Sequence, residues 1–192
     1  MSRRRVVITG MGAITPLGDT VEGMFASLLA GKSGVAPITH FDASTFPTTF
    51  AAEVKNFELS RWVKQPEFWK DACEGSRYAA AAAKQALSAS GLLDGKGERD
   101  RFGVYLGTGE ATHEVQVLLD LIGRTFNAEK YAIDEAAFGR LAMRGYHPGR
   151  QHEQELHMQS GRLADYFDLQ GPNYSCLTAC AAGTQAIGEA VE

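Results

Sequence analysis

Cysteine, positive charge and long apolar runs are all scarce in this sequence. Three cysteines in 192 residues are too few, and odd in number, for a disulfide framework, which favours a reducing compartment. Lysine and arginine total 19 against 23 aspartates and glutamates, and the net charge of −4 argues against a nucleic-acid partner. The basic and apolar stretch from Arg3 to Ile8 is too short for a signal peptide, and no run approaches the length of a membrane-spanning helix. We therefore expect a cytoplasmic, soluble protein that binds neither membrane nor nucleic acid.

The sequence does contain a series of apolar runs that end at glycine and lead into helix-forming segments. The strands that we expect are residues 3–12, 101–109 and 171–179, with a further extended piece at 50–54. The helices that we expect cover residues 20–31, 67–90, 112–145 in pieces, 153–167 and 181–192. This order of elements is typical of a parallel α/β fold, in which working groups gather at the carboxyl ends of the strands.

The glycine-rich stretch from Gly10 to Gly18 begins like a dinucleotide-binding fingerprint but does not complete it. Thr15 stands where the fingerprint requires its third glycine, and no strand with a terminal acidic residue follows about twenty residues later. We interpret the stretch as a tight structural turn, for which glycine supplies the backbone freedom. No nucleotide cofactor is expected.

The histidines and cysteines lack the spacing of a metal site. His152 and His157 are five residues apart. In a helix of 3.6 residues per turn this separates them by about 140°, so they are interpreted as part of a polar helix face. His147 begins a His-Pro-Gly sequence that we interpret as a break. Cys176 and Cys180 have no second pair to complete a zinc site, so no metal is expected.

The surroundings of Cys176 and Cys180 differ. Cys176 lies inside an expected strand and is interpreted as a packed thiol. Cys180 lies between that strand and an expected helix, and its neighbours are all small: Ala179, Ala181, Ala182 and Gly183. Small neighbours allow the tight strand-to-helix turn that exposes a nucleophile, and the free N–H groups of a first helical turn favour a thiolate and an oxyanion. From the pattern alone, Cys180 is either a catalytic nucleophile or a buried residue of a small-residue helix.

Three blocks of sequence resemble the N-terminal half of the β-ketoacyl-[acyl carrier protein] synthases, the condensing enzymes of the thiolase-like superfamily. The blocks are residues 4–42, residues 77–92 with 101–109, and residues 163–190. The first and third are the most specific, and together they cover almost the whole chain in the family's order. The resemblance implies the N-terminal half of a layered αβαβα fold, with residues 1–192 as an N-terminal domain truncated within the helix after the nucleophile.

The resemblance also implies an activity. Cys180 matches the acylated cysteine of the family's T-A-C-x-x-G motif, and its backbone N–H matches an oxyanion-hole donor. The implied reaction is a decarboxylative Claisen condensation of an acyl thioester with malonyl-[acyl carrier protein] in fatty acid or polyketide synthesis, without a cofactor. The implied partners are acyl carrier protein in its acyl and malonyl forms, and a second subunit in a homodimer or ketosynthase heterodimer. Gly109 and Glu110 match the segment that lies near the acyl chain in this family.

The chain departs from the family in two respects. The family's catalytic histidines, lysine and second oxyanion loop lie beyond the cysteine, and the chain's own histidines do not match them: His40, His113, His147, His152 and His157. In the pocket segment, the polar Glu110 and His113 indicate either a surface loop or a polar or unusual acyl substrate. Two alternatives to a condensing enzyme stay open. One is a non-catalytic partner subunit like a chain-length factor, and the other is a thiolase-type enzyme acting on coenzyme A esters.

Overall fold

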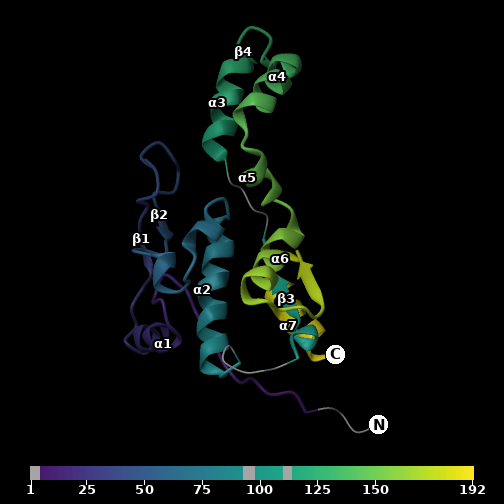
Figure 1. Cartoon of the computed structure of the whole chain (residues 1–192). Coiled ribbons are helices and arrows are strands. Elements are labelled where there is room, and N and C mark those ends of the chain that lie inside the picture. The colour runs from purple at the N-terminus through teal and green to yellow at the C-terminus, as the bar shows by residue number, and fades with distance from the viewer. Residues whose placement is uncertain (1–4, 93–97, 110–113) are drawn as a thin grey trace. The chain divides into compact units, whose positions relative to one another are not determined.

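The structure is a computed structural model that describes residues 5–92, 98–109 and 114–192. The chain divides into two compact units, Met1–Lys70 with Glu74–Glu98 and Asp71–Cys73 with Arg99–Glu192 (Figure 1). Within the described ranges, no helix combines the length and the apolar character needed to cross a bilayer.

The described residues of the first unit form two α-helices and one short antiparallel ladder. Its elements are α1 (Val21–Leu29), β1 (Val35–Pro37), β2 (Phe50–Ala52), the 3-10 helices η1 (Leu59–Arg61) and η2 (Pro66–Trp69), and α2 (Glu74–Ala89). Thr20 caps α1 by accepting a hydrogen bond from the Gly23 N–H at 3.1 Å, as expected for a threonine that precedes a helix. Gly31 follows α1 with a left-handed φ of 63°.

The glycine-rich N-terminal stretch packs closely against α2. A Cβ atom at Gly10 or Gly12 would overlap the carbonyl oxygen of Ala86 or Ala82. Glycine on one side and alanine on the other allow this approach, because neither carries bulk. Gln85 strengthens the contact by donating from Nε2 to the carbonyl of residue 13 at 3.2 Å. The stretch therefore packs against a helix, as the interpretation of a structural turn requires.

The turn itself lies between Thr15 and Gly18, which exchange backbone hydrogen bonds of 2.9 and 3.2 Å. The Thr15 hydroxyl also accepts from the Leu17 N–H at 3.2 Å. These bonds confirm that the threonine in place of the third fingerprint glycine closes a turn.

Two expectations for the first unit are wrong. The strand expected at residues 3–12 is not formed from residue 5 onward, and Val6, Val7 and Ile8 are 55%, 67% and 83% exposed. A β-branched run becomes a strand only when a neighbour accepts its hydrogen bonds, and none of the described strands pairs with it. The helix expected at 67–90 is also divided, because η2 ends at Trp69 and α2 begins at Glu74.

The second unit is centred on two parallel strands, β3 (Val104–Gly107) and β6 (Asn173–Cys176). The helices α6 (Leu156–Phe167) and α7 (Ala182–Val191) pack against them (Figure 1). The buried apolar residues of this unit are Ala72, Leu121, Leu163, Phe167, Cys176, Ala182 and Ala186. The parallel pairing of two strands that each end at a turn confirms the α/β expectation and places the carboxyl ends of β3 and β6 side by side.

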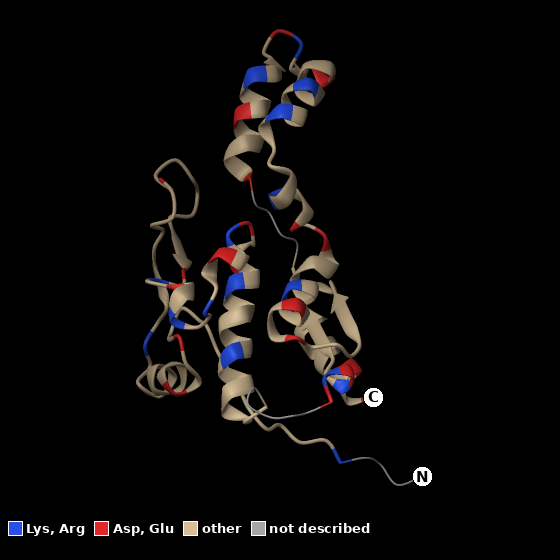
Figure 2. Cartoon of the chain, viewed as in Figure 1, with Lys and Arg blue, Asp and Glu red and all other residues tan. Residues whose placement is uncertain are grey.

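The remaining helices of the second unit are α3 (Val115–Thr125), α4 (Glu135–Gly145) and α5 (Pro148–His152), and η3 (Arg99–Arg101) precedes β3. A two-residue ladder, β4 (Phe126–Asn127) with β5 (Ala132–Ile133), joins α3 to α4. Figure 2 shows that basic and acidic residues are interspersed along α3 and α4 rather than gathered by sign. The expected break at His147 is present, because α4 ends at Gly145 and His147 is not helical. A short helix starts directly after it: His147 caps α5 by accepting from the Arg150 N–H at 3.4 Å, with proline at the first helical position.

Candidate active site

Cys180 lies on the turn between β6 and α7. It is the middle residue of a one-turn 3-10 helix, η4 (Ala179–Ala181), and its thiol is exposed. Ala179 turns the chain with a left-handed φ of 50°, which a residue with a small side chain tolerates best. The structure therefore places Cys180 on the tight strand-to-helix turn that the sequence predicts, and contradicts the alternative of a buried residue.

The strand ends beside this turn are fixed by backbone contacts. Gly107, the last residue of β3, pairs with Cys176, the last residue of β6. The Thr108 N–H continues the ladder by donating to the Cys176 carbonyl at 2.9 Å. A Cβ atom at Gly107 would overlap backbone atoms of Ala182 and Gly183. The start of α7 thus rests directly on the backbone of β3, which only glycine permits.

Cys176 is buried in the strand, as expected. It forms a small core with Ala182 and Ala186 of α7, against which the half-buried Tyr105 and Tyr174 pack. Its sulfur lies 3.4 Å from the carbonyl oxygen of Ala182, within hydrogen-bonding distance for a thiol donor. The two cysteines of the C-x3-C sequence therefore have opposite surroundings, one packed and one exposed.

Helix α6 supports β6 through polar groups as well as apolar ones. The hydroxyl groups of Ser160 and Ser175 lie 2.7 Å apart, and Ser160 is almost fully buried. Helix α7 also makes a polar contact with β6: Gln185 donates to the hydroxyl of Tyr174, the residue before Ser175, at 3.3 Å. Sequence reasoning did not find these contacts, because pairs of serine or of tyrosine and glutamine have no spacing signal along the chain.

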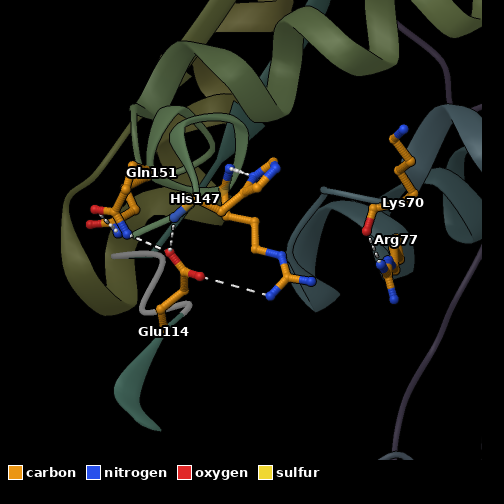
Figure 3. A network of polar contacts seen from close by, with 7 residues as sticks. Lys70, Arg77, Glu114, His147 and Gln151 are labelled. Carbon is orange, nitrogen blue, oxygen red and sulfur yellow. Dashed lines mark hydrogen bonds and ion pairs between the residues drawn. The ribbon is translucent and has the colours of Figure 1, made fainter. Parts of the chain in front are cut away.

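A second group of polar contacts lies where α3 begins. Glu114 is buried and accepts hydrogen bonds from the His147 N–H at 3.3 Å and from Gln151 Nε2 at 2.9 Å (Figure 3). Arg150 adds an ion pair at 3.8 Å. These contacts attach α5 to the start of α3. The one local signal for them is the His-Pro-Gly sequence, which predicts a helix start.

The pocket residues expected from the resemblance are described only in part. Gly109 follows β3, is exposed, and has open space where a Cβ would lie. Glu110 and His113 lie outside the described residues. Beside Gly109, the buried hydroxyl of Thr108 has no hydrogen-bond partner among the residues that the structure describes. Whether this segment contacts a substrate stays a prediction.

The structure corrects the interpretation of the paired histidines. His152 ends α5 and His157 belongs to α6, so the two do not share a helix. Their rings meet edge to face with centroids 6.0 Å apart. The described residues contain no group of three or more histidine, cysteine, aspartate and glutamate side chains arranged to hold a metal.

This arrangement can carry out thiol chemistry. The exposed sulfur of Cys180 is open to an electrophile. The N–H groups that follow it, of Ala181 and Ala182, donate to the carbonyls of residues 178 and 179 within the turn, so these two are not the free donors that the sequence led us to expect. The N–H of Cys180 itself precedes these two and lies at the reacting residue, where an oxyanion donor is needed.

Comparisons with known proteins agree with this geometry. Residues 3–192 match the family model "Beta-ketoacyl synthase, N-terminal domain". The chain is 37% identical over 190 residues to a 3-oxoacyl-[acyl-carrier-protein] synthase 2 of Coxiella burnetii, covering 99% of this chain and 42% of that protein. It is 37% identical over 196 residues to the synthase of the same name from Vibrio harveyi, again covering 99% and 42%. The chain therefore spans less than half the length of the curated relatives that it matches.

Solved structures of ketosynthases are also similar to this chain. The ishigamide ketosynthase/chain length factor is similar with a TM-score of 0.70 and 31% identity, covering 98% of this chain and 45% of that chain. A type II PKS acyl-carrier protein in complex with its ketosynthase gives a TM-score of 0.71 at 22% identity, covering 98% and 46%, which concerns the fold alone. These neighbours confirm the fold class as the N-terminal half of a thiolase-like α/β fold.

Proposed function

Because the chain belongs to the β-ketoacyl synthase family, we propose that it supplies the nucleophile of a decarboxylative Claisen condensation in fatty acid or polyketide synthesis. The observation that carries the proposal is the exposed thiol of Cys180 on a tight turn between a parallel strand and a helix. A nucleophile needs this combination of access and fixed direction.

The proposed reaction has three steps. The Cys180 sulfur attacks the carbonyl of an acyl-[acyl carrier protein] thioester, the carrier thiol leaves, and the acyl group is held as a new thioester. A malonyl-[acyl carrier protein] then loses carbon dioxide to give a carbanion, which attacks the acyl carbonyl. The product is longer by two carbons, and Cys180 is released. In each attack, the Cys180 N–H is the donor that we assign to the developing oxyanion.

The partners in this proposal are acyl carrier protein in its acyl and malonyl forms and a second ketosynthase subunit, identical or related. One structural neighbour contains an acyl-carrier protein with its ketosynthase, and others pair a ketosynthase with a chain length factor. We place the reaction in the cytoplasm, and we assign Gly109 and Glu110 to the acyl pocket. We further propose that residues 1–192 form the N-terminal domain of such a synthase.

A non-catalytic partner subunit is the second candidate, because neighbours of this fold include chain length factors. Such a subunit has no acylated cysteine. Transfer of an acyl group to Cys180 therefore separates the two candidates, and transfer from coenzyme A esters in preference to carrier protein would indicate a thiolase-type enzyme instead.

The test is to incubate the purified protein with acyl-[acyl carrier protein] and to map the acyl group by mass spectrometry. We expect one acyl group on Cys180, and none in the C180A variant. C73A is the matched control, since it removes a partly exposed thiol and should leave transfer unchanged. Acylation of no residue, or equal acylation of Cys73 and Cys180, would contradict the proposal.

Iodoacetamide provides an independent measurement. A free cysteine is only a few per cent thiolate at neutral pH, so an activated Cys180 can react up to about thirtyfold faster than free cysteine. Exposure alone already favours Cys180 over the buried Cys176, so the comparison is made with free cysteine in solution. A Cys180 rate equal to that of free cysteine would argue for an exposed but unactivated thiol.

A further inference from the structure

The buried thiol of Cys176 has a second role beside packing. We propose that Cys176 is a positioning residue for Cys180, and that it acts through the first residue of α7, Ala182. The inference rests on the proposed function, in which the direction of the Cys180 thiol matters.

Cys176 lies where the strand, the turn and the helix meet. Its carbonyl oxygen accepts the Thr108 N–H at 2.9 Å, which fixes it to the end of β3. Its side chain contacts α7, with the sulfur 3.4 Å from the Ala182 carbonyl oxygen. One residue is therefore bound to the neighbouring strand by its backbone and to the helix by its side chain.

The start of α7 is held from two directions. Gly107 of β3 allows backbone contact with Ala182 and Gly183, and Cys176 of β6 holds the Ala182 carbonyl. Ala182 and Ala186 are both 4% exposed, so the face of α7 that they form is buried, whereas Gly183 and Thr184 between them are exposed. Because only one residue separates Cys180 from Ala182, the position of Ala182 fixes the far end of the nucleophile's turn.

The near end of the turn is fixed by the strand itself. Cys176 is the last residue of β6, and Ala179 follows three positions later with its left-handed backbone. Cys176 is thus linked to both ends of residues 177–181, the five-residue segment that contains Cys180. The peptide bond joins it to the start of this segment, and its sulfur contacts Ala182, which directly follows the segment. A thiol is a weak donor, so its effect is expected on direction more than on stability.

The choice of side chain at position 176 gives separable effects. Serine and alanine are close in volume and both are smaller than cysteine, but only serine keeps a donor, with a shorter reach to Ala182. If Cys176 only fills space, alanine should be tolerated at least as well as serine, because serine adds a buried hydroxyl. If Cys176 positions Ala182, serine should be tolerated better than alanine.

The experiment measures single-turnover acyl transfer to Cys180, in C176S and C176A, as a function of acyl-[acyl carrier protein] concentration. We expect C176A to lower the maximal rate about tenfold, with the half-saturating concentration unchanged, because small displacements of a nucleophile lower rates steeply. The maximal rate of C176S is expected to stay within about threefold of that of the parent protein, because the serine hydroxyl still donates a hydrogen bond. The matched control is L163V, which shortens a buried side chain of α6 that lies outside the turn.

The outcomes are distinct. The inference is overturned if C176A transfers the acyl group as fast as the parent, if serine is no better than alanine, or if L163V lowers the rate as much at an equal fall in melting temperature. If the parent protein accepts no acyl group, the proposed function fails. The same variants are then compared by the alkylation rate of Cys180 with iodoacetamide, and an unchanged rate in C176A overturns the inference independently.

Discussion

Ala179 has a backbone conformation that residues with a side chain rarely adopt, and it lies immediately before the exposed thiol of Cys180. Its φ of 50° is in the left-handed region, which costs an L-residue about 1–2 kcal/mol relative to the right-handed one. Such strain persists only where the surrounding contacts impose it, and it is concentrated at functional sites. Here the strand ladder before Ala179 and the buried Ala182 at the start of α7 after it impose the turn.

Substitutions at Ala179 should show how much its left-handed backbone conformation affects the free energy of unfolding. We expect A179V to lower the free energy of unfolding by about 1–2 kcal/mol, because a β-branched residue fits the left-handed region poorly. A179G should leave stability within about 1 kcal/mol, since glycine adopts this φ freely but loses more entropy on folding. Urea unfolding gives both values. A181V, at a φ of −86°, is the control, and an equal loss there would show that the left-handed backbone is not the cause.

At the scale of elements, the end of the β1–β2 ladder is held by a carboxylate. Glu53 accepts hydrogen bonds from the Thr39 hydroxyl at 2.7 Å, the Thr39 N–H at 3.0 Å and the His40 N–H at 3.1 Å. These bonds, first of all that of the Thr39 hydroxyl, lower the pKa of Glu53 from 4.5 to about 2.

The lowered pKa predicts a pH dependence of this ladder. Since the folded state favours the charged form, the stabilisation is complete above the unfolded pKa near 4.5 and is lost as the pH falls towards 2. The protection of the Thr39 and His40 amides from hydrogen exchange, taken relative to the intrinsic exchange rate at each pH, should therefore fall across this window, and E53Q should remove the dependence. E58Q is the control, because the side chain of Glu58 makes no hydrogen bond at the start of η1. An identical acid profile in E53Q would show that another group is responsible.

Helix α6 is attached to the chain before it by a buried ion pair. Glu153 has no exposed surface, and its carboxylate pairs with Arg162. Removing one partner of a buried pair leaves an uncompensated charge, which typically costs about 3–5 kcal/mol, whereas replacing both can be nearly neutral. R162M should therefore destabilise by about 3 kcal/mol in urea unfolding, and the double variant E153M/R162M should recover most of that loss. A double variant as unstable as R162M would indicate that packing, not charge, sets the cost.

Some elements of the fold could be predicted from the sequence, and others could not. Helix α1 was predictable because Thr20 and Gly31 mark its ends locally, and the turn at Cys180 was predictable because its small neighbours are adjacent in sequence. The strand expected at residues 3–12 was not formed, because strand formation depends on a partner that no local pattern specifies. For the same reason, the contacts of Ser160 with β6 and of Glu114 with α5 became visible only in three dimensions.

At the scale of the whole molecule, both units carry apolar side chains that the described residues leave exposed. In the first unit these include Val7, Ile8 and Leu29, which are 67%, 83% and 74% exposed. In the second unit Ile187 of α7 is 69% exposed. Apolar surface that is gathered on one element usually marks a contact with another protein surface. The relatives, of which this chain spans 42%, have further residues that could provide such a surface.

We therefore expect the isolated 192-residue chain to self-associate and to bind the dye ANS. Sedimentation velocity measures the association, and charged substitutions identify the surface that causes it. I8K and I187K should each reduce association, because lysine keeps its charge in water. E22K on α1 and E189K on α7 are the matched controls, since they add the same side chain without removing apolar surface. A monodisperse monomer with a sharp cooperative melt and no ANS binding would contradict the expectation that residues 1–192 require a further surface to cover them.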